Sequence, residues 1–358
     1  MKKILFLIPS LSPAGGIERI VTTIANKLSN IYHPTILTFD SKESFYAVND
    51  NVQRDSLNCD FNLNMKSRLI RVFQTLNLSV KIIYTLRSYI KNNHYDYIYV
   101  THPLTHLYLL LAGVDHKKIV ISEHGASNNY NSLYRFIRNR TYKYCHAYCV
   151  PTKTDSLIYK KMGFPVYYTP HYRPDMEYKK VDGSAKVVLT VGRLTPDKQH
   201  LKLLEMWKTL CKTYPNDWIL RIVGSGELHS ALLEYIHANS MENNVELVPA
   251  NKEIERYYKE SSIFALSSRS EGFGMVLLEA ISFGLPVVSF DCPSGPRDII
   301  NSDNGYLINE NDEQDFQDKL VQLIADPAHL QMMINSSFIS SQTWKDEVIT
   351  KNWESVFK

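Results

Sequence analysis

Short apolar runs alternate with segments of helical periodicity along the whole chain, and this alternation constrains the fold more than any other feature of the sequence. The runs have the length and the β-branched or aromatic content of buried strands. They comprise residues 4–8, 34–39, 97–100, 119–122 and 147–150 in the first half and residues 186–191, 218–223, 245–247, 263–267 and 286–290 in the second. Helical patterns intervene at residues 16–28, 201–213, 227–240 and 313–325. Because strands that alternate with helices build parallel sheets, we expect an α/β protein with two doubly wound sheets facing each other across a cleft.

The length of the chain also favours two domains. With 358 residues and 44% hydrophobic content, the chain exceeds the usual size of a single core. We place the boundary in residues 172–184, where Arg-Pro-Asp and Asp-Gly-Ser triplets replace the periodic pattern. The predicted domains are residues 1–171 and 172–342. Apolar residues at helical spacing predict a last helix within residues 343–358.

Several features favour the cytoplasm. The first apolar run ends at Pro9 and is shorter than the ~7–15 residues of a signal-peptide core. No stretch approaches the ~20 apolar residues of a membrane span. The five cysteines are scattered and odd in number, which favours reduced thiols, so we interpret Cys145 and Cys149 as small apolar residues. We therefore expect a cytoplasmic protein.

The two halves differ in charge. Residues 1–170 carry 21 Lys and Arg against 10 Asp and Glu, or +11, and the remainder carries 19 against 27, or −8. Part of the positive charge lies on a predicted helix, residues 65–91, whose apolar residues repeat at helical spacing. A solvated helix face is one explanation. The other is contact with anionic lipid at the inner face of the cell membrane, or with a pyrophosphate-linked acceptor. Nucleic acid is not an expected partner because no module that reads it is present.

The stretch Glu271-Gly-Phe-Gly-Met-Val-Leu-Leu-Glu279 sets two carboxylates around a glycine-flanked turn that opens an apolar helix. The glycines allow close approach of the backbone to a ligand, and the first amides of a helix are unpaired donors that attract phosphate. Glu271 could accept hydrogen bonds from sugar hydroxyls. Glu279, further into the helix, could accept both hydroxyls of a ribose. The pattern is typical of a site for a sugar bound through a diphosphate.

The segment from Ser268 to Ala280, followed by Gly284-Leu-Pro-Val-Val, resembles the signature of the retaining nucleotide-sugar glycosyltransferases of glycosyltransferase family 4. That resemblance implies the GT-B fold, with two Rossmann-like domains, and a last helix, residues 343–358, that packs back on the first domain. The Cys-Pro-Ser-Gly-Pro run within residues 291–298 resembles the corresponding segment of enzymes that use UDP-hexoses or UDP-N-acetylhexosamines to build bacterial surface glycans. Thr169-Pro-His-Tyr172 departs from the Pro-Asn-Gly that the family usually has at the domain junction.

A leaving diphosphate needs positive donors. Gly192-Arg193 ends a predicted strand and Lys198 follows at the start of a helix, so we assign both cations to the diphosphate. They resemble the family's Arg and Lys pair, although Gln199 stands where the family often has glycine. Resemblance also implies a donor-facing Gly15-Gly16 loop, a Gly224-Ser-Gly226 loop near the nucleoside, and a contact of His124 with the transferred sugar.

These assignments give two sets of candidate site residues. The catalytic set is Glu271, His124, Arg193 and Lys198. The donor-binding set is Gly15, Gly16, Gly192, Arg193, Lys198, Gly224, Gly226, Phe273, Gly274, Met275, Val276 and Glu279.

The expected reaction is transfer of a hexose or N-acetylhexosamine from a UDP-sugar to a lipid-linked or polysaccharide glycan. No nucleophile remains once both glutamates are assigned to binding, so the resemblance implies retention by front-face attack. The sequence has no Asp-x-Asp pair, and we expect neither a metal nor another cofactor. Two alternatives are a UDP-sugar epimerase or phosphorylase of the same fold, and a non-catalytic sugar-nucleotide sensor.

Overall fold

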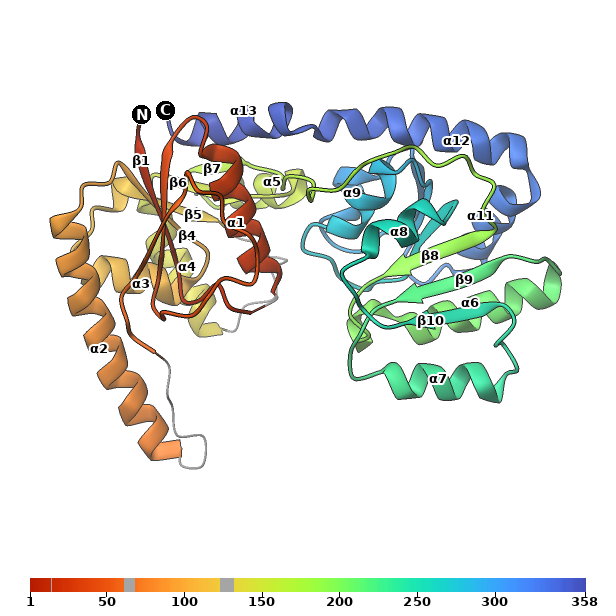
Figure 1. The fold of residues 1–358 in the computed structure, drawn as a ribbon, viewed down its shortest axis with the longest axis horizontal. Coiled ribbons are helices and arrows are strands. Elements are labelled where there is room, and N and C mark those ends of the chain that lie inside the picture. The colour runs from red at the N-terminus through yellow and green to blue at the C-terminus, as the bar shows by residue number, and fades with distance from the viewer. Residues whose placement is uncertain (14, 61–67, 123–131) are drawn as a thin grey trace. The chain divides into compact units, whose positions relative to one another are not determined.

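The chain forms two compact units in the computed structural model, which describes residues 1–13, 15–60, 68–122 and 132–358 (Figure 1). Unit 1 comprises Met1–Tyr172 and Asp346–Lys358, and unit 2 comprises Arg173–Lys345. The predicted boundaries between the two domains lie after residues 171 and 342. Each unit contains one parallel sheet with helices on its faces, as the alternation of strands and helices predicts.

The described residues of unit 1 form a seven-stranded sheet in the order β3-β2-β1-β4-β5-β6-β7, and every neighbouring pair is parallel. Its strands are β1 (Lys3–Ile8), β2 (His33–Thr38), β3 (Gln53–Ser56), β4 (Tyr97–Val100), β5 (Ile119–Ser122), β6 (Ala147–Val150) and β7 (Val166–Tyr168). The two edge strands β3 and β7 were not predicted. The sequence of β3 is the polar Gln-Arg-Asp-Ser, and β7 has three residues, so neither shows a buried apolar run.

The helices of unit 1 flank this sheet. They are α1 (Gly16–Leu28), α2 (Arg68–Asn92), α3 (Pro103–Leu111), α4 (Ser132–Thr141), α5 (Lys153–Lys161) and the C-terminal α13 (Asp346–Val356). Trp353 of α13 is fully buried, with its ring 6.0 Å from that of Tyr99 on β4. The Phe357 carbonyl accepts a 2.9 Å hydrogen bond from Lys2, and the Val356 carbonyl accepts one of 2.8 Å from His146. The last helix is therefore part of the core of unit 1.

Unit 2 contains, within the described residues, a six-stranded parallel sheet in the order β10-β9-β8-β11-β12-β13. Its strands are β8 (Val187–Val191), β9 (Ile219–Val223), β10 (Val245–Val248), β11 (Ile263–Leu266), β12 (Val287–Phe290) and β13 (Gly305–Ile308). Its helices are α6 (His200–Thr213), α7 (His229–Ala238), α8 (Ile254–Lys259), α9 (Met275–Ser282), α10 (Pro296–Ile299), α11 (Glu313–Ala325) and α12 (Pro327–Ser340). The strand order reverses between β8 and β11, and at such a switch point the loops after the two strands diverge and leave room for a ligand.

Helix α2 leaves an apolar surface exposed in unit 1. Its apolar residues repeat at helical spacing, but only the C-terminal half of the helix packs deeply, through Ile82 and Leu86. The exposed apolar residues, each 48% to 79% accessible, are Ile70, Val72, Phe73, Leu76, Val80 and Tyr84. Figure 1 shows α2 on the outside of unit 1. Among the described residues, no helix combines the length and apolar character needed to cross a bilayer.

We predict that Trp353→Ala destabilises unit 1 by about 3–5 kcal/mol, because it leaves a cavity beneath α13. Val348→Ala, a truncation of an exposed residue on the same helix, should change the free energy of unfolding by less than about 0.5 kcal/mol. Urea unfolding of both variants measures the difference. Equal effects would show that α13 is not anchored by this ring.

Candidate active site

The candidate site in unit 2 is built from the loops that follow β8 and β11, on the two sides of the switch point. The first loop carries Arg193 and ends in a short 3-10 helix, Pro196–Lys198. The second loop carries Glu271 and leads into α9. Backbone and side-chain hydrogen bonds join them: the Arg269 amide donates to the Asp197 carbonyl at 2.8 Å, and the Ser267 hydroxyl donates to the Lys198 carbonyl at 2.9 Å. The loops therefore form one connected surface at the sheet edge.

Lys198 and Glu271 form an ion pair across these loops. Their Nζ and Oε1 atoms lie 2.7 Å apart, and the two side chains are only 16% and 9% accessible. A pair this buried loses much of its hydration, and removing one partner leaves an uncompensated charge. The residue predicted to hold phosphate and the residue predicted to hold sugar hydroxyls are thus neighbours. A sugar diphosphate carries hydroxyls and phosphate oxygens close together, so this arrangement suits such a ligand.

Arg193 lies on the exposed part of the first loop, two residues after the end of β8. Its charge acts on the nearby Asp197. Burial raises the pKa of Asp197, but a hydrogen bond from Thr195 and the charges of Lys198 and Arg193 outweigh burial and hold this pKa below its usual value. Asp197 therefore stays ionised beside Arg193 and Lys198 at this end of the sheet.

The N-terminus of α9 lies directly after Glu271. Gly274 caps the helix in the left-handed region, with φ of 87° and ψ of 52°, which strongly favours glycine. A Cβ at this position would lie 2.9 Å from a methyl carbon of Leu277. The amides of Met275 and Val276 open the helix, where helical geometry offers no acceptor for them. This end can therefore bind an anion through backbone donors and the helix dipole.

Glu279 lies on α9 and is 3% accessible. Its Oε2 accepts a 2.7 Å hydrogen bond from the hydroxyl of Tyr258 on α8. Tyr258 was not predicted as a site residue, since a tyrosine in a short charged segment carries no motif and only the fold brings α8 to α9. Glu279 thus has a neighbour that orients its carboxylate.

The glycines of the loop after β9 have a packing role. A Cβ on Gly224 would lie 1.9 Å from the Gly192 carbonyl oxygen, and one on Gly226 would lie 2.5 Å from the Leu194 carbonyl oxygen. The Leu194 amide also donates to the Ser225 carbonyl at 3.0 Å. Gly224 and Gly226 therefore allow this loop to support the loop that carries Arg193. Their predicted contact with the donor stays a prediction.

Residues 291–298 pack against the Gly-Phe-Gly turn. Ser294 forms a β-bridge with Glu271, and a Cβ on Gly295 would lie 1.9 Å from the Phe273 carbonyl oxygen. Phe273 is buried, with its ring 5.7 Å from that of Trp344. Burial and the nearby Glu271 raise the pKa of the Cys292 thiol to about 12, so this thiol stays protonated and unreactive. The segment therefore lies beside Glu271.

Gln199 occupies the position at which the family often has glycine, and its backbone explains that preference. The residue has φ of 53° and ψ of 37°, in the left-handed region. A non-glycine residue is strained there by about 1 kcal/mol. Gln199 therefore keeps the backbone path of glycine, and the position of Lys198 does not depend on a glycine after it.

The candidate residues of unit 1 belong to two segments that are far apart in the sequence, Gly15-Gly16 and His124. Gly15 caps α1 and Gly16 is its first residue. A Cβ on Gly15 would lie 2.1 Å from a carboxylate oxygen of Glu18, so this side chain folds back over the helix N-terminus. His124 falls outside the described residues, which end at Ser122 of β5 before resuming at Ser132. Within the described parts of the chain, no three His, Cys, Asp or Glu side chains gather as metal ligands.

Comparisons with known proteins agree with this architecture. Residues 14–170 match the family model described as Glycosyltransferase Family 4, and residues 174–338 match the model described as Glycosyl transferases group 1. The amylovoran biosynthesis glycosyltransferase AmsD of Erwinia amylovora is 29% identical over 99% of both chains. A Campylobacter jejuni α-1,4-N-acetyl-D-galactosaminyltransferase, named for a diNAcBac-PP-undecaprenol-linked acceptor, is 24% identical over 99% of this chain and 97% of its own.

Solved structures share the fold. Anabaena HepE, crystallised with UDP and glucose, has a TM-score of 0.74 at 18% identity, and 99% of each chain is covered. The lipopolysaccharide outer core galactosyltransferase WaaB has a TM-score of 0.73 at 20% identity, with 99% of this chain and 98% of that chain covered. These likenesses confirm the predicted GT-B fold, with its two Rossmann-like sheets.

We predict a pH dependence of stability from His200, the first residue of α6. Burial, followed by the charge of Lys198, lowers its pKa to about 4. The unfolded chain, with a pKa near 6.5, therefore binds the proton more tightly, and stability is lost as pH falls from about 6.5 to 4. His200 contributes on the order of 2 kcal/mol to that loss.

Burial also lowers the pKa of His106 in unit 1 to about 4. His106 therefore adds to the loss of stability at low pH. Urea unfolding at pH 7 and pH 4.5 should show a smaller pH effect in His200→Gln than in the unsubstituted protein. An unchanged pH effect would contradict the assignment.

Proposed function

We propose that this chain, which belongs to the glycosyltransferases of family 4, transfers a hexose or N-acetylhexosamine from a UDP-sugar to a lipid-linked or surface-polysaccharide glycan. The proposed transfer retains the anomeric configuration and uses no metal. One observation carries the proposal: the Lys198–Glu271 pair, Arg193 and the N-terminus of α9 gather at the switch point of the sheet in unit 2.

The names of similar proteins support the donor and the acceptor. HepE has been crystallised with UDP-glucose, and a Salmonella typhimurium relative is named a lipopolysaccharide 1,6-galactosyltransferase. The Campylobacter relative is named for a polyprenyl-pyrophosphate-linked glycan. By analogy, we assign a UDP-sugar donor and a glycan or polyprenyl-pyrophosphate-linked acceptor to this chain.

In the proposed reaction, an acceptor hydroxyl attacks the anomeric carbon on the face from which UDP departs. The bond between that carbon and the β-phosphate oxygen breaks, and the acceptor proton passes to the departing phosphate. Arg193, Lys198 and the amides of Met275 and Val276 stabilise the negative charge that grows on UDP. Because this charge is larger in the transition state than in the bound donor, these contacts raise the rate and not only the affinity.

The two glutamates have binding roles in this proposal. Glu271 accepts hydrogen bonds from sugar hydroxyls while Lys198 balances its charge. Glu279 accepts from the ribose hydroxyls. Since Glu271 pairs with Lys198 and Glu279 accepts from Tyr258, neither resembles a free nucleophile, which supports front-face attack over a covalent intermediate.

Unit 1 supplies the acceptor side in this proposal. The amides of Gly15 and Gly16, at the start of α1, face the donor, and His124 contacts the transferred sugar. Arg193, Lys198 and the helix amides take the place that a divalent cation has in other nucleotide-sugar enzymes, so no metal or cofactor is required.

We also propose that α2 holds the protein against an anionic bilayer surface. Its exposed apolar face carries Phe73 and Leu76, and the helix has five basic residues and no acidic one. Apolar insertion combined with positive charge is the pattern of an interfacial helix. The proposed location is the inner face of the cell membrane, where a polyprenyl-linked acceptor would also lie.

We predict that the protein releases UDP from UDP-glucose, UDP-galactose or one of their N-acetyl forms in the presence of a lipid-extract acceptor, with or without chelator.

Arg193→Ala should lower kcat at least ~100-fold with little change in melting temperature, because the residue is exposed and acts on the transition state. Lys212→Ala, which removes an exposed cation from the far end of α6, is the control.

UDP release that requires an acceptor distinguishes a transferase from an epimerase, which needs none. Any UDP release excludes a non-catalytic sensor. Near-normal turnover of Arg193→Ala at saturating donor would refute its role. Loss of activity with chelator would refute metal independence.

We predict that the protein co-sediments with vesicles containing anionic lipid and that the Phe73→Glu, Leu76→Glu double variant binds them at least ~10-fold more weakly. Charged residues in place of buried apolar ones oppose insertion and repel the anionic surface. Leu157→Glu, at an equally exposed leucine on α5 of the same unit, is the control. Equal, negligible binding to anionic and neutral vesicles would end the proposal.

A further inference from the structure

We infer that Tyr258 is a positioning residue that holds the Glu279 carboxylate in the rotation needed to accept both ribose hydroxyls of the nucleotide. The inference rests on the proposed role of Glu279 as the ribose ligand. It starts from the 2.7 Å hydrogen bond that the Tyr258 hydroxyl donates to Oε2 of Glu279. Tyr258 is fully buried and Glu279 nearly so, and a charge-assisted hydrogen bond is strong in such surroundings.

Aromatic packing fixes the ring of Tyr258. The ring of Phe283, at the C-terminal end of α9, stacks on it at 5.3 Å with an angle of 5° between the planes. Phe264 of β11 also stacks on it, at 6.1 Å and 23°. The phenol therefore lies beside the strand that precedes the site loop and the helix that carries Glu279. With the ring held in this way, its hydroxyl has a defined direction toward the carboxylate.

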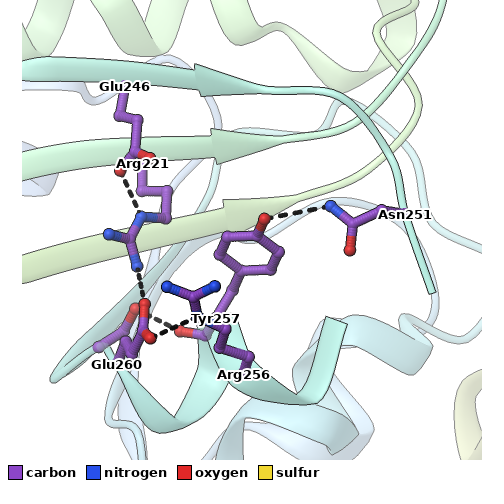
Figure 2. A network of polar contacts seen from close by, with 7 residues as sticks. Arg221, Glu246, Asn251, Arg256, Tyr257 and Glu260 are labelled. Atoms are coloured by element: carbon purple, nitrogen blue, oxygen red, sulfur yellow. Dashed lines mark hydrogen bonds and ion pairs between the residues drawn. The ribbon is translucent and has the colours of Figure 1, made fainter. Parts of the chain in front are cut away.

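A polar network holds α8 itself to the sheet (Figure 2). Arg221 of β9 donates to Glu246 of β10 at 2.6 Å and to Glu260, which directly follows α8, at 3.2 Å. Arg256 of α8 also donates to Glu260, at 2.6 Å. Asn251, in the loop before the helix, donates through its side chain to the hydroxyl of Tyr257, the fourth residue of α8, at 3.1 Å. The contact of Glu260 with Arg221 thus ties the C-terminal end of this six-residue helix to β9, close to Tyr258.

A carboxylate binds a diol well only when its rotation places both oxygens correctly. A hydrogen bond that sets this rotation before the nucleotide arrives lowers the entropy lost on binding. Removing the Tyr258 hydroxyl should therefore weaken the part of nucleotide affinity that depends on the ribose hydroxyls. Binding of the diphosphate, through other residues, should be unaffected.

The test measures binding of UDP and of 2′,3′-dideoxy-UDP to the full chain by calorimetry. The unsubstituted protein should prefer UDP. Tyr258→Phe should reduce that preference about tenfold through weaker UDP binding alone, and in turnover it should raise KM for the donor while kcat stays nearly constant. The control is Tyr306→Phe, which removes a phenol hydroxyl with a 2.7 Å hydrogen bond to His329 elsewhere in unit 2.

Glu279→Gln separates the inference from the proposed function. If Glu279→Gln loses the preference for UDP and Tyr258→Phe keeps it, Glu279 binds ribose and the inference about Tyr258 is wrong. If Glu279→Gln also keeps the preference, the ribose role itself is wrong. Equal loss of UDP and dideoxy-UDP affinity in Tyr258→Phe would reduce Tyr258 to a packing residue and overturn the inference.

Discussion

The ion pair between Lys198 and Glu271 is the interaction on which the candidate site depends, because it joins the two loops that diverge at the switch point of the sheet in unit 2. Two nearly buried charges are costly to desolvate, and their attraction offsets this cost only with good geometry and further hydrogen bonds. The backbone supplies that geometry, since the Asp197 and Lys198 carbonyls accept hydrogen bonds from the opposite loop. The pair also keeps a cation for phosphate beside an acceptor for hydroxyls.

Close backbone packing surrounds this pair and leaves its loops little freedom. The loop after β9 supports the loop of Arg193 through Gly224 and Gly226, and the segment after β12 supports the Gly-Phe-Gly turn through Gly295. At each of these positions a side chain would overlap a backbone carbonyl oxygen. The glycines therefore serve two purposes in this region. Gly274 shapes the N-terminal end of α9, and Gly224, Gly226 and Gly295 allow neighbouring loops to pack closely. A site assembled from rigid supports is well suited to electrostatic stabilisation of a leaving group.

The sequence predicted the parts of the fold that depend on burial. The ten predicted strands are present because buried parallel strands need continuous apolar runs, and the glutamate motif lies at the start of a helix because its glycines set the turn. The polar edge strand β3 lacked that signal. The exposure of the apolar face of α2 was not foreseen, since periodicity identifies an apolar face but not whether another element covers it. Tyr258 and the left-handed Gln199 required coordinates, because both depend on where α8 and the loop after β8 lie.

A crystal structure of the full chain with UDP bound tests the central claim most directly. We expect the phosphates to contact the amides of Met275 and Val276 together with Arg193 and Lys198, and Glu279 to accept hydrogen bonds from both ribose hydroxyls. UDP bound with its phosphates away from the N-terminus of α9, or with its ribose away from Glu279, would contradict this placement of the nucleotide.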